Sequence, residues 1–259
     1  MNIQEASEKI KKSKKYKNLP LDFISEKVKE YANKKKLKEL EDVALKEIKS
    51  LLHKMHGSFR ITKSKLSKHI KLRDYKQALK SNRSTQERLE EYEQIYQKIF
   101  EITGKPKSIL DLGCGINPLS IPFMKLNLNL LEYVAYDINE SEILVLNEFF
   151  KLENIHGKAE VLDLSKIESI NALPSADACF MFKLVDILES KGHKYAEEAI
   201  QILIKKCDYV VVSFATHTLG GNKMKYAERG WIERMLSRVG LKFEKFEMSN
   251  EIFYIISKL

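Results

Sequence analysis

The sequence predicts an α/β fold in which an all-helical domain precedes a doubly wound, mostly parallel sheet. From residue 107 to 259, short apolar runs rich in β-branched residues alternate with helical stretches, which is typical of a parallel sheet covered on both faces. In residues 1–80 apolar residues recur at three- and four-residue spacing, and no alternating β-branched run occurs. A polar turn around Ser249 and Asn250 joins the last two apolar runs, so these should pair as an antiparallel hairpin.

Residue patterns place each element along the chain. The strands are expected at residues 108–112, 132–136, 159–163, 177–182, 208–214, 241–247 and 252–257, and the helices among them at residues 118–126, 139–152, 191–206 and 229–239. About three helices are expected in residues 1–80, with a polar loop from Gly57 to Lys68. A further helix should begin at Ser84, which has capping-box spacing with Glu87, and should end before Gly104 and Pro106. The chain thus divides into a basic helical domain, residues 1–80, a linking helix, residues 81–106, and a sheet domain, residues 107–259.

The charge of the chain is uneven. Residues 1–80 hold 23 of the 45 Lys and Arg residues but only 10 of the 36 Asp and Glu residues, a balance of +13 against −4 in the rest of the chain. Within residues 51–80, Asp74 is the single acid among nine basic residues. Like charges at this density repel one another unless a partner neutralises them, so the helical domain is expected to dock on a polyanion. The alternative is a solvated, lysine-rich surface.

The remaining composition excludes several classes of protein. No apolar stretch reaches the roughly 18 residues that cross a bilayer, and Lys and Glu interrupt the N-terminus too often for a signal peptide. The three cysteines, Cys114, Cys179 and Cys207, are widely spaced, which disfavours a disulfide framework or a structural zinc site. We therefore expect a cytoplasmic protein with no membrane association and no bound metal.

A glycine-containing turn follows the first expected strand, in the run SILDLGCGINP. Gly113 and Gly115 allow the backbone to turn sharply and to approach a ligand closely. The third glycine of a dinucleotide fingerprint is missing, and Asn117 followed by Pro118 provides a helix start near its place. The turn is therefore less suited to a diphosphate than a dinucleotide site would be.

Three carboxylates accompany the first three expected strands. Asp111 precedes the glycines, where it suits a ligand with a cationic amino-acid end. Asp137 ends the second strand, where a carboxylate can accept both ribose hydroxyls, and Asp163 ends the third, where it can accept from an adenine amino group. A helix follows Asp137 and Asp163, so each could instead be an N-cap. Together with five parallel strands closed by a hairpin, the layout of class I (Rossmann-like) methyltransferases, the carboxylates predict a site for S-adenosylmethionine.

Several segments carry a more specific resemblance. They are KSKKYKNL (12–19), RSTQERL (83–89), SILDLGCGINPLSIPFM (108–124), AYDIN (135–139), FKLVDILE (182–189) and SFATHTLGG (213–221). The most specific are the STxER run before the sheet and the NPL that follows the glycine turn. Nearly the whole chain resembles the 16S rRNA (guanine-N7) methyltransferases of the aminoglycoside-resistance (Arm/Rmt) type. The resemblance implies methyl transfer from S-adenosylmethionine to a guanine of the decoding region, in the assembled 30S subunit, and a role in drug resistance.

The resemblance also implies which residues contact the cofactor. Arg88 would bind the methionine carboxylate, as a guanidinium fork can. The other implied residues are Asn82, Arg83 and Ser84 at the methionine end, Phe59 packed near it, and Leu164 and Phe182 beside the adenosine. The chain differs from the family on the target side. It has Asn82 and Arg83 where the family has His and a small residue, and Ala215 and His217 where the family has Pro and a basic residue.

The chemistry expected at this site is direct transfer to a ring nitrogen. Guanine N7 has a free lone pair and no proton, so it needs placement in line with the methyl group and no general base. The run MFKLVD after the fourth expected strand lacks the motif that accepts an exocyclic amino group for adenine-N6 methylation, and no cysteine is placed to attack a pyrimidine. Lys183 and His217 are the expected catalytic residues, at the opening of the active site where they would contact the target nucleotide. Trp231 could stack on a flipped base, although core packing is favoured.

The resemblance further implies that the helical domain grips the small ribosomal subunit. The expected RNA-binding residues are Lys54, Arg60, Lys63, Lys65, Lys68, Lys71, Lys223 and Lys225. A monomer acting on 16S rRNA is expected. Two alternatives remain open: a methyltransferase acting on another RNA nucleotide, a protein or a small molecule, and a non-catalytic ribosome-binding factor that kept the fold.

Overall fold

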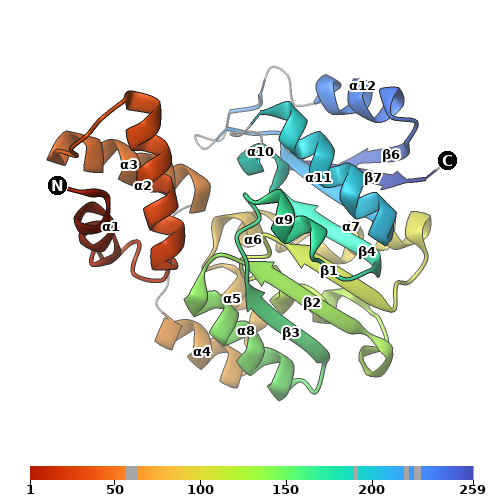
Figure 1. The fold of residues 1–259 in the computed structure, drawn as a ribbon. Coiled ribbons are helices and arrows are strands. Elements are labelled where there is room, and N and C mark those ends of the chain that lie inside the picture. Colours follow the sequence, from red (N-terminus) through yellow and green to blue (C-terminus); the bar gives the residue numbers. More distant parts are fainter. Residues whose placement is uncertain (57–62, 189–191, 219–221, 225–228, 259) are drawn as a thin grey trace.

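The computed structural model describes residues 1–56, 63–188, 192–218, 222–224 and 229–258 (Figure 1). Its centre is a seven-stranded sheet with the order β3-β2-β1-β4-β5-β7-β6. The strands are β1 (Ser108–Leu112), β2 (Glu132–Asp137), β3 (His156–Val161), β4 (Ala176–Phe182), β5 (Cys207–Ala215), β6 (Lys242–Glu247) and β7 (Glu251–Ser257). The first five pair in parallel, and β7 pairs antiparallel with both β5 and β6. The expected α/β fold with its closing hairpin is confirmed.

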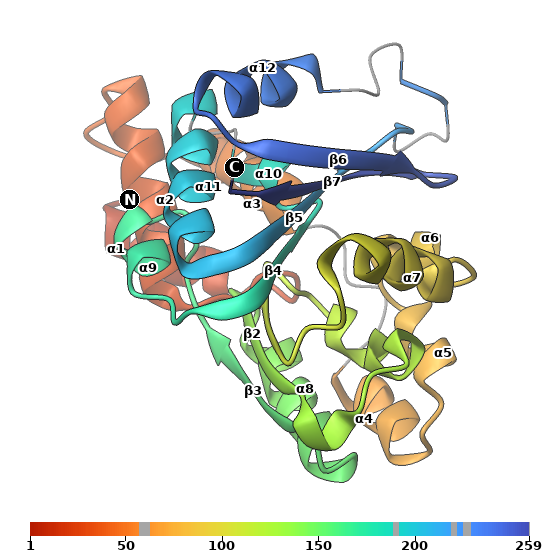
Figure 2. The ribbon, with the colours of Figure 1, turned by 90° about the vertical axis from the view of Figure 1, so that its right-hand side faces the viewer.

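Helices cover both faces of this sheet (Figure 2). One layer holds α7 (Tyr92–Thr103), α8 (Glu140–Leu152) and the 3-10 helix η1 (Asn117–Met124), and the other holds α9 (Ile167–Asn171), α10 (Val185–Leu188), α11 (His193–Lys206) and α12 (Gly230–Arg238). A short 3-10 helix, η2 (Leu128–Leu130), precedes β2. Side chains alternate between the two layers along β1, so Ile109 packs in the first core and Leu110 in the second. Asp111 shares the face of Ile109 and is buried in the layer of α7.

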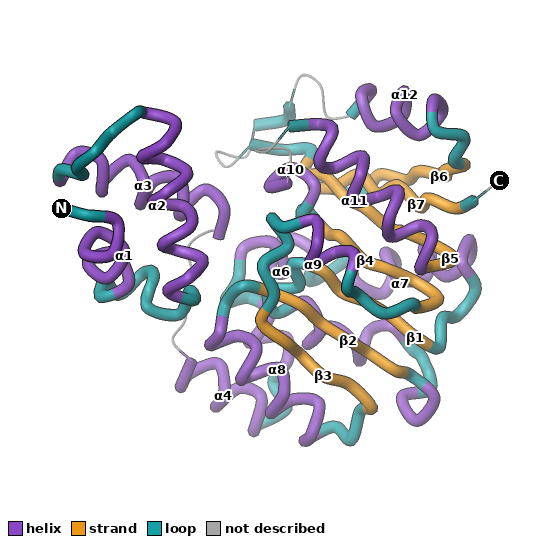
Figure 3. Tube along the Cα trace, in the orientation of Figure 1, coloured by secondary structure: helices purple, strands orange, loops and turns teal. Residues whose placement is uncertain are grey.

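The N-terminal part, α1 (Ile3–Lys11), α2 (Leu21–Lys35) and α3 (Asp42–His56), is a separate group of helices (Figure 3). It has a core of its own, which includes Ile10, Ile24 and Leu45. Several contacts join this group to the start of α8: Ile138 packs against its core, the Glu140 N–H donates to the Asn18 carbonyl at 3.0 Å, and Lys11 Nζ lies 3.4 Å from Glu140 Oε2. The helical group therefore lies against the segment that follows β2.

The next two helices, α4 (Lys63–Lys71) and α5 (Tyr75–Leu79), belong to the sheet core. Leu66 and Ile70 of α4 are buried there, and α4 packs against α8. The boundary between the core of α1–α3 and the sheet core thus lies between α3 and α4 and not at residue 80. The reason is that α8, and not α1–α3, covers the apolar face of α4. Residues 63–68 were expected in a loop, but they are helical, since Leu66 and Ile70 give this basic segment one apolar face.

The helix expected from Ser84 is divided into α6 (Arg83–Arg88) and α7. Asn82 caps α6, because its Oδ1 accepts the Ser84 N–H at 2.9 Å, and the expected capping box of Ser84 with Glu87 does not form. Glu87 instead accepts from Arg83 at 2.8 Å. The end of α7 at Gly104, with φ of 69°, is as expected.

Three further expectations need correction near the strands. The helix expected at 118–126 is the 3-10 helix η1, which contains Pro122, a residue with no N–H for an α-helical bond. Asn117 is the first residue of η1 and not its cap. Strand β3 ends at Val161, paired with Asp137, so Asp163 lies two residues beyond the strand. The sequence pattern was misleading here because β3 is an exposed edge strand with few apolar residues.

Candidate functional site

The glycine turn after β1 has the conformation that its residues require. Gly113 and Gly115 have φ of +63° and +51°, a region that side chains with a Cβ rarely adopt. A Cβ at Gly113 would lie 2.7 Å from Leu184 Cδ1. The Gly115 N–H donates to Asp137 Oδ2 at 2.9 Å, and the Asn139 N–H donates to Asp137 Oδ1 at 2.9 Å. The structure therefore brings Gly113, Gly115 and Asp137 together, with Asp137 holding the turn.

Asp111 lies beneath this turn and is 1% exposed. Its Oδ2 accepts from Asn117 Nδ2 at 2.9 Å and from the Tyr133 hydroxyl at 2.7 Å. Burial raises the pKa of Asp111 to about 6, although the two hydrogen bonds act in the opposite direction. Asn117 Oδ1 in turn accepts from the Tyr92 hydroxyl at 3.0 Å and from Arg88 Nη1 at 3.4 Å. Asp111 therefore orients Asn117, and through it the turn is connected to Arg88.

Arg88 is almost fully buried, and its charge is balanced inside the protein. Its Nε donates to Glu251 Oε2 at 2.9 Å, and its guanidinium lies 5.0 Å from the centroid of the Phe182 ring. Glu251, the first residue of β7, also accepts from the Ser213 hydroxyl and lies 3.2 Å from Lys183 Nζ. Burial alone would raise the pKa of Glu251, but Arg88 and Lys183 outweigh it and hold that pKa below its usual range. Phe182 was expected beside the adenosine together with Leu164, but it lies at the Arg88 end of the site, because it packs in the core layer of α7 whereas Leu164 packs in the other layer.

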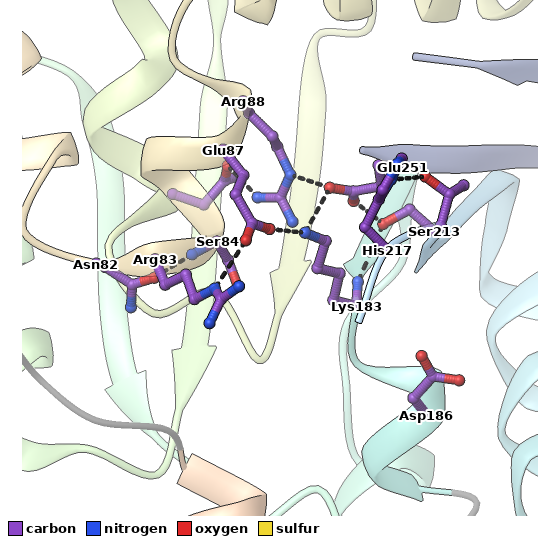
Figure 4. Close-up of polar contacts among 12 residues, drawn as sticks. Asn82, Arg83, Ser84, Glu87, Arg88, Lys183, Asp186, Ser213, His217 and Glu251 are labelled. Carbon is purple, nitrogen blue, oxygen red and sulfur yellow. Dashed lines mark hydrogen bonds and ion pairs between the residues drawn. The ribbon is translucent and has the colours of Figure 1, made fainter. Parts of the chain in front are cut away.

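Lys183 joins this buried group to the opening of the site. Its Nζ donates to Glu87 Oε2 at 2.7 Å, which connects α6 with the end of β4, as Figure 4 shows. Lys183 has φ of 55°, a left-handed conformation that costs energy for a residue with a side chain. Its N–H donates to the Ser213 hydroxyl at 3.0 Å, which holds it there. His217 follows β5, the neighbour of β4 in the sheet, and its Nδ1 lies 3.0 Å from the Thr216 hydroxyl.

The α6 residues lie beside the same turn. A Cβ at Gly115 would be 3.6 Å from Asn82 Nδ2, so Asn82 borders the glycine turn. Arg83 pairs with Glu87, and Ser84 follows in the first turn of α6 (Figure 4). Five charged side chains therefore form one connected group with three cations and two carboxylates: Arg83, Arg88, Lys183, Glu87 and Glu251.

The segment after β3 forms the other end of the site. The Ser165 N–H donates to Asp163 Oδ1 at 2.9 Å. Asp163 Oδ2 is buried and has no hydrogen-bond partner among the described residues, although Lys166 Nζ lies 4.0 Å from it, an ion pair beyond hydrogen-bond distance. The Leu164 carbonyl accepts the Tyr195 hydroxyl at 2.8 Å. One carboxylate oxygen is thus fixed, while the other is an acceptor without a donor.

Other residues expected at the site have different surroundings. Phe59, Arg60, Lys225 and the Lys54 side chain lie outside the described residues. Lys223 is exposed and forms a β-bridge with His217. Trp231 is partly buried and packs against the sheet core, as favoured, with its ring 4.6 Å from that of His193. The three cysteines are buried, which agrees with a packing role. In the described ranges there is no group of three or more metal-ligating side chains, and none of the helices could span a membrane.

The α4 lysines, by which we mean Lys63, Lys65, Lys68 and Lys71, are exposed. Leu66 and Ile70 of the same helix are buried in the sheet core, so α4 carries these lysines on its exposed surface. No described side chain forms an ion pair with them. A polyanion could therefore reach all four.

Sequence reasoning missed several residues of the charged group. Glu251 connects Arg88 with Lys183 and accepts from Ser213, yet neither Glu251 nor Ser213 was singled out from the sequence, and Glu87 was expected only as a capping-box partner and not as the partner of Lys183. A signal was present for two of them. Ser213 interrupts the apolar run of β5, and Glu251 begins an otherwise apolar β7, so both place polar atoms in a buried sheet that must supply partners.

Comparisons with known proteins agree with this geometry. A family model described as "Ribosomal RNA methyltransferase (FmrO)" matches residues 70–255. The 16S rRNA (guanine(1405)-N(7))-methyltransferase of Proteus mirabilis is 30% identical over 225 residues, covering 83% of this chain and 75% of that protein. The protein of the same description from Serratia marcescens is 27% identical and covers 100% of this chain and 99% of its own.

Solved structures share the complete fold. The crystal structure of the 16S rRNA methyltransferase RmtF in complex with S-adenosyl-L-homocysteine has a TM-score of 0.84 and 23% identity, and it covers 100% of this chain and 98% of that chain. The likeness extends over the helical N-terminal part as well as the sheet. The resemblance seen in the sequence motifs is confirmed, and the chain belongs to the FmrO family of ribosomal RNA methyltransferases.

Proposed function

We propose that this protein transfers a methyl group from S-adenosylmethionine to N7 of guanine 1405 in 16S rRNA, within the assembled 30S subunit. The observation that carries the proposal is the connected site at the carboxyl ends of β1 to β5, in a chain of the ribosomal RNA methyltransferase family. Its relative from Proteus mirabilis is described by this same reaction. The proposed substrate is cytoplasmic, and modification of the decoding region would give aminoglycoside resistance.

The residues present fit S-adenosylmethionine. The buried Asp163 Oδ2 lacks a donor, and the adenine amino group would supply one. The two glycines with positive φ leave the turn without side chains beside Asp137, where the ribose would lie. The connected charged group has one cation in excess, and the methionine carboxylate would balance it at Arg88. Leu164 would border the adenine, and Asn82, Arg83, Ser84 and Phe182 would surround the methionine end.

When bound, the cofactor supplies an electrophilic methyl group on a sulfonium. The residues of this chain then have to place guanine N7 in line with that methyl group and to exclude water. Lys183 is held by Glu87 and Glu251 in a single position at the end of β4, where it would contact the target nucleotide. His217, at the end of β5, would contact the base or a neighbouring phosphate. Neither residue has to remove a proton, because N7 carries none.

The exposed α4 lysines support docking on RNA. Cations that pair with phosphates release counterions, which makes the binding strong at low salt and weak at high salt. Together with Lys223 and the basic residues outside the described ranges, these lysines would contact the 16S rRNA. We propose that a single copy of the chain does this, without a metal ion.

The proposal can be tested by methylation of purified 30S subunits with radiolabelled S-adenosylmethionine. Borohydride reduction and aniline cleavage at 7-methylguanine, followed by primer extension, should place one stop at guanine 1405. Naked 16S rRNA and a 50S subunit serve as comparison arms. Equal or greater labelling of naked rRNA would overturn the assignment to the assembled subunit, and label on protein or small molecules alone would overturn the proposal.

A further inference from the structure

The segment that follows β3 lies against helix α2 of the N-terminal group. Lys166 Nζ lies 2.6 Å from Glu26 Oε2, and Lys27 Nζ donates to the Ser165 hydroxyl at 3.3 Å. These contacts join residues that are far apart in the sequence, and they meet next to Asp163. The N-terminal helices therefore reach the adenine end of the proposed cofactor site.

Lys27 is an unusual residue for a surface helix, because it is only 9% exposed. A buried ammonium group is tolerated where it has partners. Within α2, Lys27 Nζ donates to both carboxylate oxygens of Glu30 at 3.1 Å and lies 5.5 Å from the centroid of the Phe23 ring. Its third hydrogen bond, to Ser165, crosses from the helical group to the sheet domain. The side chain therefore has a fixed position on both sides of this boundary.

Ser165 transmits that position to Asp163. Its hydroxyl accepts from Lys27, and its N–H donates to Asp163 Oδ1 at 2.9 Å. The bond to Oδ1 sets the rotation of the carboxylate, so that the second oxygen, Oδ2, is the buried acceptor without a donor. A series of two hydrogen bonds thus connects Lys27 with Oδ1 of the carboxylate whose other oxygen, Oδ2, would receive the adenine amino group.

We propose that Lys27 is a positioning residue for the cofactor: through Ser165 it orients the Asp163 carboxylate toward the adenine amino group, so that the N-terminal helical group helps to select adenine. This inference rests on the proposed cofactor site. It assigns a cofactor role to a residue of α2, a helix of the domain that was expected to dock on RNA. Lys27 itself does not touch the cofactor.

The test compares two ligands of the full-length protein by calorimetry. S-adenosylhomocysteine carries the 6-amino group, and S-inosylhomocysteine carries an oxygen in its place. The wild type should prefer the adenine compound. Lys27→Met and Ser165→Ala should each lower this preference about fivefold, as expected for the removal of one hydrogen bond, and the double variant should lower it no further.

Two further variants make the result specific. Lys29→Met makes the same substitution at an exposed position of the same helix, and it should keep the wild-type preference. Asp163→Asn should reverse the preference, because the amide NH2 would replace Oδ2 and would donate to the 6-oxygen. Thermal unfolding of each variant monitors folding, and Ser165→Ala carries the test if Lys27→Met does not fold.

The outcomes separate the two proposals. If Asp163→Asn reverses the preference while Lys27→Met and Ser165→Ala keep it, the cofactor site stands and the positioning role is overturned. An equal loss of affinity for both ligands in those two variants would also overturn it, since a purely structural defect does not discriminate at position 6. If Asp163→Asn keeps the preference, the assignment of adenine to Asp163 is wrong, and the inference fails with it.

Discussion

The ion pair of Arg88 with Glu251 makes the sharpest prediction about stability. Both side chains are almost fully buried, with 4% and 2% of their side-chain surface exposed. Glu251→Gln keeps the shape of the side chain and its bond to Ser213 but removes the charge that balances Arg88. Arginine stays protonated at any accessible pH, so its charge would remain in the core without a carboxylate partner.

The size of the effect follows from the neighbours. Breaking a buried ion pair from one side costs about 3–5 kcal/mol. Glu251 balances two cations, and one of them, Lys183, keeps Glu87 at 2.7 Å. Arg88 is the cation left without a carboxylate, with a long contact of 3.4 Å to Asn117. We therefore expect a loss near the lower limit, about 3 kcal/mol of unfolding free energy, which corresponds to a Tm roughly 6–12 °C lower.

Denaturant titration followed by the fluorescence of Trp231 measures this loss, because the single tryptophan packs against the sheet core and would become exposed on unfolding. Glu247→Gln, on the exposed edge strand β6, is the matched control and should change stability by less than about 0.5 kcal/mol. The folded-state pKa of Glu251 is lowered, so its contribution is complete above the ordinary glutamate value of about 4.3 and is lost as the pH falls through the folded value. A loss below about 1 kcal/mol at pH 7, or one that does not shrink in acid, would refute this account of the ion pair.

Three other predictions concern the turn and the docking surface. Burial raises the folded pKa of Asp111 to about 6, so between about pH 4 and 6 the folded chain binds a proton there that the unfolded chain lacks. Stability should therefore fall as the pH rises through this window, and Asp111→Asn should flatten that part of a Tm–pH profile. Gly113→Ala should weaken S-adenosylhomocysteine binding at least about tenfold in calorimetry, and adding Leu184→Ala should restore only part of it, since the 2.7 Å clash is relieved while the positive φ remains. Replacing the four α4 lysines by Gln should weaken 30S binding. It should also reduce the slope of log K against log salt by up to about 0.9 for each phosphate that is no longer neutralised. The control variant Lys205→Gln, on α11, should leave the slope unchanged.

Much of the sheet was predictable because its strands have a strong signal. Buried parallel strands such as β4 and β5 are short apolar runs, and the glycine turn marks the end of β1. Strand β3 was misplaced by about two residues because it lies at the edge, where an exposed face removes the apolar pattern. The break between α6 and α7 was not visible either, since the helical spacing of apolar residues continues across it.

The candidate site was predictable only where it uses local motifs. Gly113, Gly115 and Asp137 follow from the pattern of strand, turn and helix. The partners of Arg88 do not, because Glu251 is 163 residues away and is brought close by the insertion of β7 between β5 and β6. The role of Lys27 was hidden for the same reason, since a lysine on an amphipathic helix looks like any other surface lysine until tertiary packing buries it.

The position of β7 has a consequence for synthesis of the protein on the ribosome. The core of α1–α3 is complete once residue 52 has emerged, so this part can fold early. The carboxylate that neutralises Arg88 and Lys183 is on β7, the last strand along the sequence, which must enter between β5 and β6. A nascent chain therefore lacks the carboxylate partner of Arg88 until its final strand is in place, and a premature stop before residue 251 would leave the folded α1–α3 group attached to a sheet domain without that carboxylate.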